Sequence, residues 1–371
     1  MCHYLIGIEV SLRILHVVSS LGSGGVERML INYYKHLNRS KFTFDFIVHG
    51  ERVEVLEESF AKMGSQIYHA PPKKSSFIKN LAFIESVIRN GNYDVVHAHQ
   101  NLSSFAPLVF ARLHGVPVRI SHGHGYPSTN ALLASLLKVV GEVAANHYFA
   151  CTGQVGQWMF PHKWKQEKTS KFIMTNAFEL DHYKYTEKSR QNWRKNLHLG
   201  SFPTIIQIGR LSAEKNHSFT LSLLKELRNH GPWQLLIVGE GELLESLKRQ
   251  AKELGVSENV QFLGYQADIR GLLSAADVAV MPSLSEGLGL AAIEAQVANL
   301  KVVAASSLPN DVKVSENIQF LDLNLSSWTQ EILTTQFKNT NRVSEPTQEM
   351  QKYNISDAAI SYSQFMSKIS K

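Results

Sequence analysis

Short runs of apolar residues alternate along the chain with longer segments in which apolar residues recur at every third or fourth position. The short runs have the length and composition of buried strands, and the longer segments have the spacing of amphipathic helices. One of the longer segments places Val26, Met29, Leu30, Tyr33 and Leu37 on a single helical face. This alternation predicts an α/β protein whose parallel sheets are covered by helices on both faces.

The expected strands fall into two groups, one in each half of the chain. In the first half they are Arg13–Val18, Phe44–Val48, Gln66–His69, Val95–His97, Val118–Ser121 and His147–Ala150. In the second half they are Thr204–Ile208, Trp233–Val238, Val260–Leu263, Val278–Met281, Val302–Ala304 and Ile318–Leu321. Crossover helices are expected at residues 225–230 and 242–254. A chain of 371 residues can form two domains. We therefore predict domains at residues 1–178 and 201–354, joined by the polar, charge-rich residues 179–200.

Two carboxylates, Glu286 and Glu294, stand eight residues apart after the expected strand that ends at Met281. Glu286 lies in a Ser/Gly-rich turn, and Glu294 lies in the helix that this turn opens. Free backbone N–H groups at a helix N-terminus form an anion site. The amides that could bind phosphate here are those of Leu288, Gly289 and Leu290. Glu294, about 9 Å further along the helix axis, is better suited to a polyol. A phosphate and a polyol together indicate a nucleotide-sugar site.

A second motif complements the first. The expected strand Thr204–Ile208 is followed by Gly209 and by two cations, Arg210 and Lys215. If both cations point into one cleft, they can neutralise a diphosphate without a metal ion. A further glycine loop, Val238-Gly239-Glu240-Gly241, follows the next expected strand.

Together these motifs resemble the retaining, family-4 glycosyltransferases of the GT-B fold. Members of that family carry a strand followed by Gly-Arg…Lys, then Val-Gly-x-Gly, and finally two Glu residues separated by seven others. All of these features occur here in that order. The segments Ser307–Val312 and Ile318–Leu321 resemble the corresponding segments of enzymes of bacterial exopolysaccharide, capsule and lipopolysaccharide synthesis. The family usually has Pro where this chain has Gly289.

The resemblance implies two Rossmann-like domains that face each other across a cleft, with the donor bound by the C-terminal domain. It also implies that the last helix, from about residue 355, packs back onto the N-terminal domain. Glu286 would hold the sugar, and Glu294 would hold the ribose. The implied donor-binding residues are Gly24, Gly25, Gly209, Arg210, Lys215, Glu286, Gly287, Leu288, Gly289, Leu290 and Glu294.

A glycine loop around Gly24 and Gly25 follows the first expected strand. By itself it could be a dinucleotide loop, but the third glycine of that motif and the acidic residue after the second strand are both missing. The loop resembles instead the Gly-Gly-x-Glu loop of the glycosyltransferase family, in which glycine lets the backbone approach the donor. Glu27 is then either an acceptor contact or a stabilising acid in the first turn of the following helix.

Four histidines follow or end two expected strands: His97, His99, His122 and His124. The carboxyl ends of parallel strands line the ligand crevice of open α/β sheets. His-x-His pairs bind zinc in some proteins, but no neighbouring Cys, Asp or Glu completes a ligand set here, so no metal is expected. The family resemblance implies that His122 or His124 contacts the transferred sugar, with a slight preference for His122. His97 and His99 are expected to be structural or to lie at the acceptor edge.

Charge and composition limit the partners and the location. The chain carries a net charge of +6, and residues 1–178 alone contain 18 Lys and Arg against 11 Asp and Glu. A basic N-terminal half is suited to anionic lipid headgroups or to a diphosphate-bearing acceptor. Its cations are not clustered with aromatic residues in the manner of a nucleic-acid site. Only two cysteines are present, and no apolar run is long enough to span a membrane. We expect a cytoplasmic protein, with peripheral contact to the inner face of the cytoplasmic membrane. Basic residues next to aromatic or apolar ones are suited to the headgroup zone, and the candidates are Lys73 and Lys74 with Phe77 and Ile78, and Lys163, Trp164 and Lys165 with Trp158 and Phe160.

The predicted activity is transfer of a sugar, with retention of configuration, from a nucleoside diphosphate sugar to a glycan or lipid-linked acceptor. UDP is the expected nucleotide. The proposed catalytic residues are His122, His124, Glu286, Arg210 and Lys215, and neither a cofactor nor a metal is expected. Two alternatives stay open: a sugar-nucleotide epimerase of the same fold, and a catalytically silent partner subunit of a glycosyltransferase.

Overall fold

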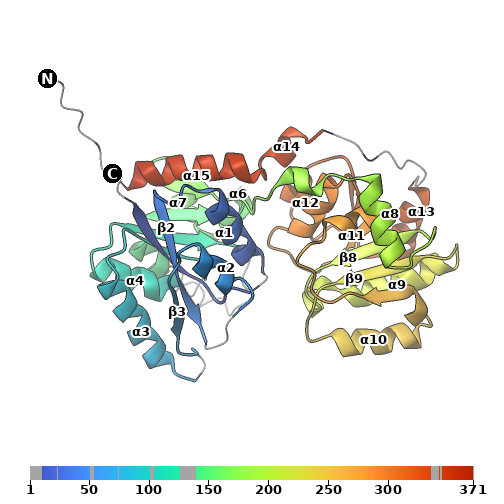
Figure 1. The fold of residues 1–371 in the computed structure, drawn as a ribbon, viewed down its shortest axis with the longest axis horizontal. Coiled ribbons are helices and arrows are strands. Elements are labelled where there is room, and N and C mark those ends of the chain that lie inside the picture. The colour runs from blue at the N-terminus through green and yellow to red at the C-terminus, as the bar shows by residue number, and fades with distance from the viewer. Residues whose placement is uncertain are drawn as a thin grey trace. The chain divides into compact units, whose positions relative to one another are not determined.

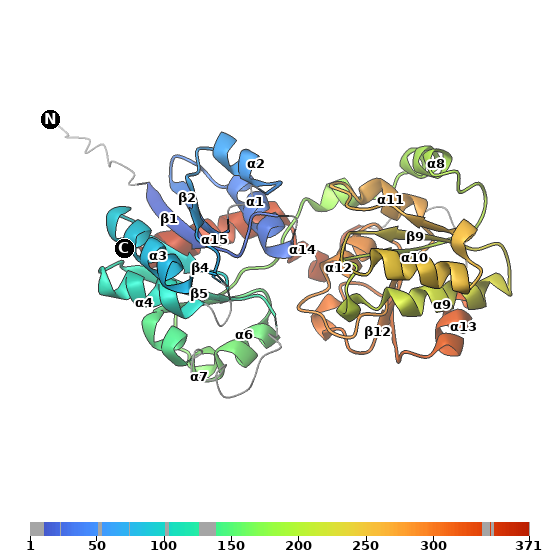
Figure 2. The same ribbon diagram turned by 90° about the horizontal axis from the view of Figure 1, so that it is seen from below.

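The structure is a computed structural model that describes residues 11–22, 24–50, 54–73, 75–100, 104–125, 139–335, 342 and 345–370. The chain divides into two compact units. The first unit comprises Met1–Phe178 and Lys352–Lys371, and the second comprises Glu179–Gln351. Each unit contains its own parallel β-sheet (Figures 1 and 2). Two Rossmann-like domains of this kind make up the GT-B fold.

Among the described residues, the first unit contains a seven-stranded sheet with the order β3-β2-β1-β4-β5-β6-β7. Its strands are β1 (Leu12–Val17), β2 (Phe42–His49), β3 (Ile67–Ala70), β4 (Val95–Ala98), β5 (Val118–Gly123), β6 (His147–Ala150) and β7 (Lys171–Ile173). The six strands predicted in this half are therefore present. The seventh, β7, was not predicted because it is only three residues long and none of its residues is buried.

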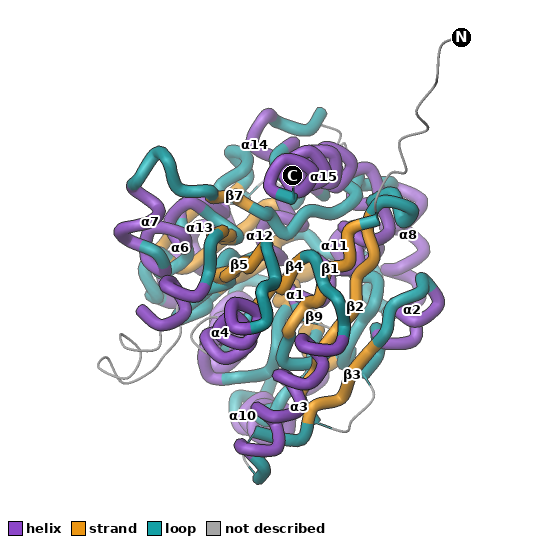
Figure 3. The backbone as a smooth tube through the Cα atoms, turned by 90° about the vertical axis from the view of Figure 1, so that its left-hand side faces the viewer, coloured by secondary structure: helices purple, strands orange, loops and turns teal. Residues whose placement is uncertain are grey.

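Helices cover both faces of this sheet. They are α1 (Gly25–His36), α2 (Glu57–Lys62), α3 (Phe77–Asn90), α4 (Phe105–Leu113), α6 (Gly153–Met159), α7 (Pro161–Lys165) and α15 (Ile355–Ile369). One face packs against α1, α2 and α15, and the other packs against α3 and α4. Figure 3 shows α2 and α4 on opposite sides of the strands.

The last helix completes the core of the first unit. The side chain of Asn354 accepts a hydrogen bond from the Ser356 amide at 3.0 Å and so caps the start of α15. Tyr362 and Met366 are fully buried in the same core as Tyr33 and Phe44. Figure 1 shows α15 lying along this unit. Residues distant in sequence thus build one hydrophobic core.

In the described part of the second unit, the sheet has six strands in the order β10-β9-β8-β11-β12-β13. These are β8 (Thr204–Ile208), β9 (Gln234–Val238), β10 (Val260–Phe262), β11 (Val278–Met281), β12 (Lys301–Ala305) and β13 (Ile318–Leu321). Its helices are α8 (Glu187–Asn196), α9 (His217–Arg228), α10 (Leu244–Glu253), α11 (Arg270–Ala275), α12 (Leu290–Val297), α13 (Leu325–Thr334) and α14 (Gln348–Gln351). The helix predicted at residues 225–230 is the end of α9, which begins eight residues earlier.

Residues 179–200 are not the simple linker that the sequence predicted. They contain a short 3-10 turn, Leu180–Tyr183, and helix α8, and they belong to the second unit. Helix α8 buries none of its residues, so it has no apolar face for a pattern to reveal. Arg190 and Arg194 attach it instead, by donating hydrogen bonds to the Ala275 carbonyl at 3.0 and 2.7 Å and by pairing with Asp277.

Candidate active site

The loops after β8 and β9 lie directly against each other in the second unit. The Gly209 amide donates to the Val238 carbonyl, and the Leu211 amide donates to the Glu240 carbonyl, both at 2.9 Å. A Cβ atom on Gly239 would overlap the Gly209 carbonyl oxygen. Gly239 also has a φ of +136°, a conformation that favours glycine. The Val-Gly-x-Gly motif therefore has a structural reason: it lets the loop after β9 support the loop that carries Arg210.

Lys215 is held where the loops after β8 and β11 meet. Its carbonyl accepts a hydrogen bond from the Gln207 side chain at 2.7 Å, and Asn216 follows it in a left-handed conformation. The Leu284 amide donates to the Glu214 carbonyl at 2.7 Å and so joins the two loops. The ammonium group of Lys215 forms an ion pair with Glu286, which follows β11.

Glu286 is positioned by residues around it as well as by Lys215. The Ser283 hydroxyl donates to its carboxylate at 2.8 Å, and the Ser307 hydroxyl donates to the Ser283 carbonyl at 2.6 Å. The Glu286 side chain is 10% exposed and that of Lys215 is 26% exposed, so a ligand can reach the pair. Arg210 is exposed, whereas Lys215 already contacts a carboxylate. Of the two cations predicted to bind phosphate, only Lys215 would therefore have to exchange an ion pair for the phosphate.

The turn before α12 ends in Gly289, which has a φ of +78°. Proline cannot adopt this angle because its ring fixes φ near −65°, so the residue that the family usually carries would require another loop conformation. A Cβ atom on Gly289 would lie 3.2 Å from Val312 Cγ2, a close contact in addition to the strained φ. In the part of the chain that the structure describes, no carbonyl accepts from the amides of Leu288, Gly289 or Leu290. These amides remain available to an anion.

Glu294 lies on α12 and is only 3% exposed. The Tyr183 hydroxyl donates to its Oε1 atom at 2.7 Å, which fixes the direction of the carboxylate. Sequence reasoning missed Tyr183 because it falls in residues 179–200, which gave no strand or helix signal. Ser283 was missed as well, although its position three residues before Glu286 allows a hydroxyl to reach that carboxylate.

In the first unit, the glycine loop begins helix α1. Gly24 and Gly25 are both exposed, and the side-chain amide of Asn176 donates to the Gly25 carbonyl at 3.4 Å. A Cβ atom on Gly24 would overlap the carboxylate of Glu27. Glu27 therefore lies back over the start of the helix, which favours the stabilising role of a first-turn acid over an acceptor contact.

The four predicted histidines lie together with a fifth, His16. His16 and His97 are register partners on β1 and β4, His122 is on β5, and His99 and His124 follow β4 and β5. His16 Nδ1 and His99 Nε2 share a hydrogen bond at 2.9 Å, as do His99 Nδ1 and His124 Nε2. His97 Nε2 and His122 Nδ1 share one at 3.0 Å. We call these five residues the histidine cluster. Sequence reasoning missed His16 because it stands alone within an apolar strand.

Burial determines the state of the histidine cluster. It lowers the pKa of His16 and of His124 to about 3, and it lowers the pKa of the other three rings well below the ordinary value. All five rings are therefore neutral near pH 7. His122 is fully buried and His124 is partly exposed. Of the two predicted sugar contacts, His124 is thus the one that a ligand can reach. His97 and His99 lie inside the protein rather than at an exposed edge.

Two family models match the chain. The model "Glycosyltransferase Family 4" matches residues 23–165, and "Glycosyl transferases group 1" matches residues 189–319. Among curated proteins, the chain is 28% identical over 312 residues to "Putative glycosyltransferase EpsF" of Bacillus subtilis (strain 168), covering 81% of this chain and 80% of that protein. It is 26% identical over 322 residues to the Escherichia coli "UDP-Gal:alpha-D-GlcNAc-diphosphoundecaprenol alpha-1,3-galactosyltransferase", covering 82% and 81%.

A solved structure has the same fold over nearly the whole chain. The crystal structure of Anabaena Alr3699/HepE in complex with UDP and glucose superposes with a TM-score of 0.80 at 18% identity, covering 96% of this chain and 100% of that one. The two family models fall one in each unit, and this structural likeness extends over both. Together with the ordered glycine, cation and carboxylate motifs, they show that the chain belongs to the family-4 glycosyltransferases with the GT-B fold.

Proposed function

We propose that the chain transfers a sugar from a UDP-sugar to a glycan or lipid-linked acceptor, with retention of the anomeric configuration. The reaction would serve the synthesis of a surface polysaccharide. The observation that carries this proposal is the meeting of Lys215 and Glu286 beside the open amides of Leu288–Leu290. A cation and free amides bind phosphate, and a carboxylate binds sugar hydroxyls. Two similarities support the donor class: the Escherichia coli relative is named for a UDP-sugar, and Alr3699/HepE was crystallised with UDP.

Binding of the diphosphate would rearrange the Lys215–Glu286 pair. A phosphate oxygen that takes the place of the carboxylate beside Lys215 leaves Glu286 free to accept hydrogen bonds from the sugar. Ser283 keeps Glu286 in place during this exchange. Arg210 is exposed and can close on the phosphate without breaking an existing ion pair. Glu294, held by Tyr183, would accept hydrogen bonds from the ribose.

In the proposed reaction, the bond between the anomeric carbon and the diphosphate oxygen breaks. The acceptor oxygen forms its bond to that carbon on the same face, and the acceptor proton passes to the leaving phosphate. The positive groups and amides around the phosphate stabilise the negative charge that develops there. In the first unit, Gly25 and His124 remain the proposed contacts of the transferred sugar. We further propose that the diphosphate is bound without a divalent ion.

Calorimetry and a transfer assay test this function. The purified protein should bind UDP more tightly than GDP, and the affinity for UDP should survive dialysis against EDTA. Supplied with UDP-galactose, UDP-glucose or GDP-mannose and a diphosphoundecaprenol-linked acetylglucosamine, it should consume one of the UDP-sugars. The anomeric configuration of the product is then read by NMR. A requirement for Mn²⁺ or Mg²⁺ would contradict the metal-free donor site, and an inverted product would contradict retention.

The membrane location is a separate proposal. Among the described residues, no helix is both long and apolar enough to cross a bilayer. On α3, the side chains of Phe77 and Ile78 are 54% and 80% exposed, and Lys79 beside them is exposed as well. Exposed apolar side chains with a neighbouring cation are suited to the headgroup zone of an anionic membrane. We propose that the start of α3 makes this contact.

The structure corrects other residues that seemed suited to membrane contact. Phe160 is buried in the core at 1% exposure, so it cannot enter the headgroups. The Lys73 ammonium group donates to the Gln100 side chain at 2.9 Å, and burial lowers its pKa to about 8. Trp158 remains 40% exposed. Lys74 lies outside the described residues.

A further inference from the structure

We propose that His99, His122 and His124 form a binding site for a transition cation such as Zn²⁺, with His16 and His97 as hydrogen-bonding supports behind two of the ligands. The site rests only on side chains of the first unit, and it shares His124 with the proposed sugar contact, so the ion binding is tested directly and not through sugar transfer. One ring nitrogen from each of the three ligands lies within 4.8 Å of the others. Neutral imidazole is a preferred ligand of zinc, copper and nickel.

The spacing of the rings is close to what a cation needs. His99 Nδ1 and His124 Nε2 are 2.9 Å apart and share one proton. Nitrogens bound to Zn²⁺ lie about 2.0–2.1 Å from the ion, which places two ligands of a tetrahedral site about 3.3 Å apart. The two nitrogens therefore need to move apart by only a few tenths of an ångström for a cation to replace the proton that they share. The ring of His122 lies beside that of His124, with a centroid distance of 3.9 Å and an angle of 31° between the ring planes, so the third ligand is close to the other two.

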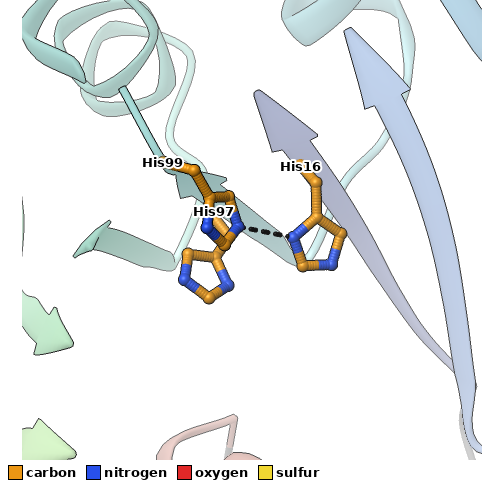
Figure 4. A group of neighbouring side chains, drawn as sticks. All are labelled: His16, His97 and His99. Atoms are coloured by element: carbon orange, nitrogen blue, oxygen red, sulfur yellow. Dashed lines mark hydrogen bonds between the residues drawn. The ribbon is translucent and has the colours of Figure 1, made fainter. Parts of the chain in front are cut away.

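The supporting histidines are placed as the outer partners of metal ligands usually are. A ligating histidine generally donates its other ring N–H to a nearby acceptor, which fixes the ring orientation. Here the second nitrogen of His99 bonds to His16 at 2.9 Å, and that of His122 bonds to His97 at 3.0 Å. Figure 4 shows the hydrogen bond between His16 and His99, with the ring of His97 next to the ring of His99, on which it stacks. Binding an ion at the proposed atoms leaves both bonds in place.

Unsatisfied nitrogens give an independent reason for a ligand. In the described part of the chain, His16 Nε2, His97 Nδ1 and His122 Nε2 are buried and have no hydrogen-bond partner. A buried polar atom without a partner loses its hydrogen bonds to water and gains none in return, and native proteins contain few such atoms. A cation coordinated by His122 Nε2 would satisfy one of these atoms directly. It is the only one of the three that belongs to a proposed ligand.

A second group of three, His16, His97 and His99, also brings its ring nitrogens within 4.8 Å. All three of these residues are buried, so an ion has no route to them from solvent. His124 is partly exposed and gives the first group an entry path. Three imidazole nitrogens favour an ion such as Zn²⁺ or Co²⁺ over Mg²⁺, which prefers oxygen ligands.

Titration with cobalt tests the site. The protein is prepared without a histidine tag, treated with a chelator and titrated with Co²⁺, because tetrahedral Co²⁺ has visible absorption bands that Zn²⁺ lacks. We expect one equivalent of Co²⁺ to bind and one equivalent of Zn²⁺ to remove the bands. His124→Gln should weaken Co²⁺ binding at least tenfold, whereas His124→Cys, which supplies a thiolate ligand, should retain binding. His162→Gln changes an exposed histidine outside the cluster and should bind as the unaltered protein does.

Circular dichroism of each variant first establishes that it is folded, and His124 is the ligand most tolerant of change because it is partly exposed. The proposal is overturned if the unaltered protein shows no tetrahedral bands at one equivalent of Co²⁺. It is also overturned if a folded His124→Gln variant binds Co²⁺ with unchanged affinity while His16→Asn abolishes binding. That second result would assign the ion to His16, His97 and His99 instead.

Discussion

At the scale of single residues, Lys215 and Arg210 illustrate how two similar cations can differ in their surroundings. Lys215 pairs with the mostly buried carboxylate of Glu286, whereas Arg210 is exposed on the loop after β8. Removal of one partner of a buried ion pair leaves the other charge without compensation, which costs more than the pair itself contributes. Removal of an exposed cation has no such effect on folding. The two substitutions therefore separate catalytic from structural effects.

We predict that Arg210→Ala and Lys215→Ala each remove at least ~2 kcal/mol of transition-state stabilisation, about a thirtyfold loss in kcat/KM. Arg210→Ala should leave the melting temperature unchanged, and Lys215→Ala should lower it. The control is Lys248→Ala, which breaks an exposed ion pair with Glu245 and should affect neither quantity. Normal turnover in both variants would remove these cations from the proposed mechanism.

Tyr183 supports a second residue-scale prediction. Tyr183→Phe removes only the hydroxyl that donates to Glu294, so the carboxylate loses its fixed direction while the packing stays the same. We expect the Kd for UDP to rise about tenfold, which corresponds to about 1.4 kcal/mol. Tyr185→Phe is the matched control, since the Tyr185 hydroxyl bonds to the exposed Glu187. An equal change in both variants, measured by calorimetry, would contradict the proposed role.

The sequence could predict the residues that carry charge in the site, but not most of the residues that hold them. Lys215, Glu286 and Glu294 were found because their motifs have a fixed local spacing. The contact between Tyr183 and Glu294 joins residues that are 111 positions apart, and no local pattern signals such a pair. His16 was missed for the same reason, because its partner His99 lies 83 positions away.

At the scale of elements, the strands were predictable and the polar helix was not. The central strands are buried on both faces, so they appear in the sequence as short apolar runs. Helix α8 is held by guanidinium groups and by Trp193, which lies so close to α11 that a Cβ atom on Gly271 would overlap its indole ring. This attachment produces no periodic apolar pattern. The boundary at Phe178 coincides with a change in composition, whereas the fold of residues 179–200 depends on distant contacts.

The start of α9 gives a pH-dependent prediction. His217 is 1% exposed, and in the described part of the chain neither of its ring nitrogens has a hydrogen-bond partner. Desolvation, and then the charge of Lys215, lower its pKa to about 4. The unfolded chain therefore takes up a proton at this residue near pH 6.5, and the folded chain does so only near pH 4. Between these values the stability falls as the pH falls, because the unfolded state binds more protons.

We expect His217→Leu to be as stable as the unaltered protein at pH 8 and more stable at pH 5. The difference should grow by about 1.4 kcal/mol for each pH unit below 6.5, down to about pH 4. Urea unfolding at several pH values measures it. His162→Leu alters an exposed histidine and should leave the pH profile of stability as it is. Parallel profiles for His217→Leu and the unaltered protein would contradict the lowered pKa.

At the scale of the whole molecule, the excess positive charge of residues 1–178 and the exposed start of α3 support the proposed attachment to an anionic membrane. Each Lys or Arg near such a surface contributes about 1 kcal/mol, and salt screens this attraction. Apolar side chains that enter the headgroups add a contribution that depends little on salt. The two contributions can therefore be measured separately.

We predict that the protein sediments with vesicles of phosphatidylglycerol at low salt and less with them at high salt, and that neutral vesicles bind it poorly. Phe77→Ser combined with Ile78→Ser should weaken the binding at both salt concentrations. Phe202→Ser, which changes an exposed aromatic residue of the second unit, is the control. If phosphatidylglycerol vesicles at low salt leave the protein in the supernatant, membrane attachment is excluded and a soluble acceptor is favoured.

The return of α15 to the first unit has a consequence for synthesis on the ribosome. Residues 179–351 are continuous in sequence, so the second unit can fold as soon as they have emerged. The first unit is translated earlier, yet its core lacks Ile355, Tyr362 and Met366 until the whole second unit has been translated. Domains usually fold in the order in which they are made. In this chain the domain that begins first would be completed after the second one, and until then its aromatic residues Phe44 and Phe149 would lack their contacts with Tyr362.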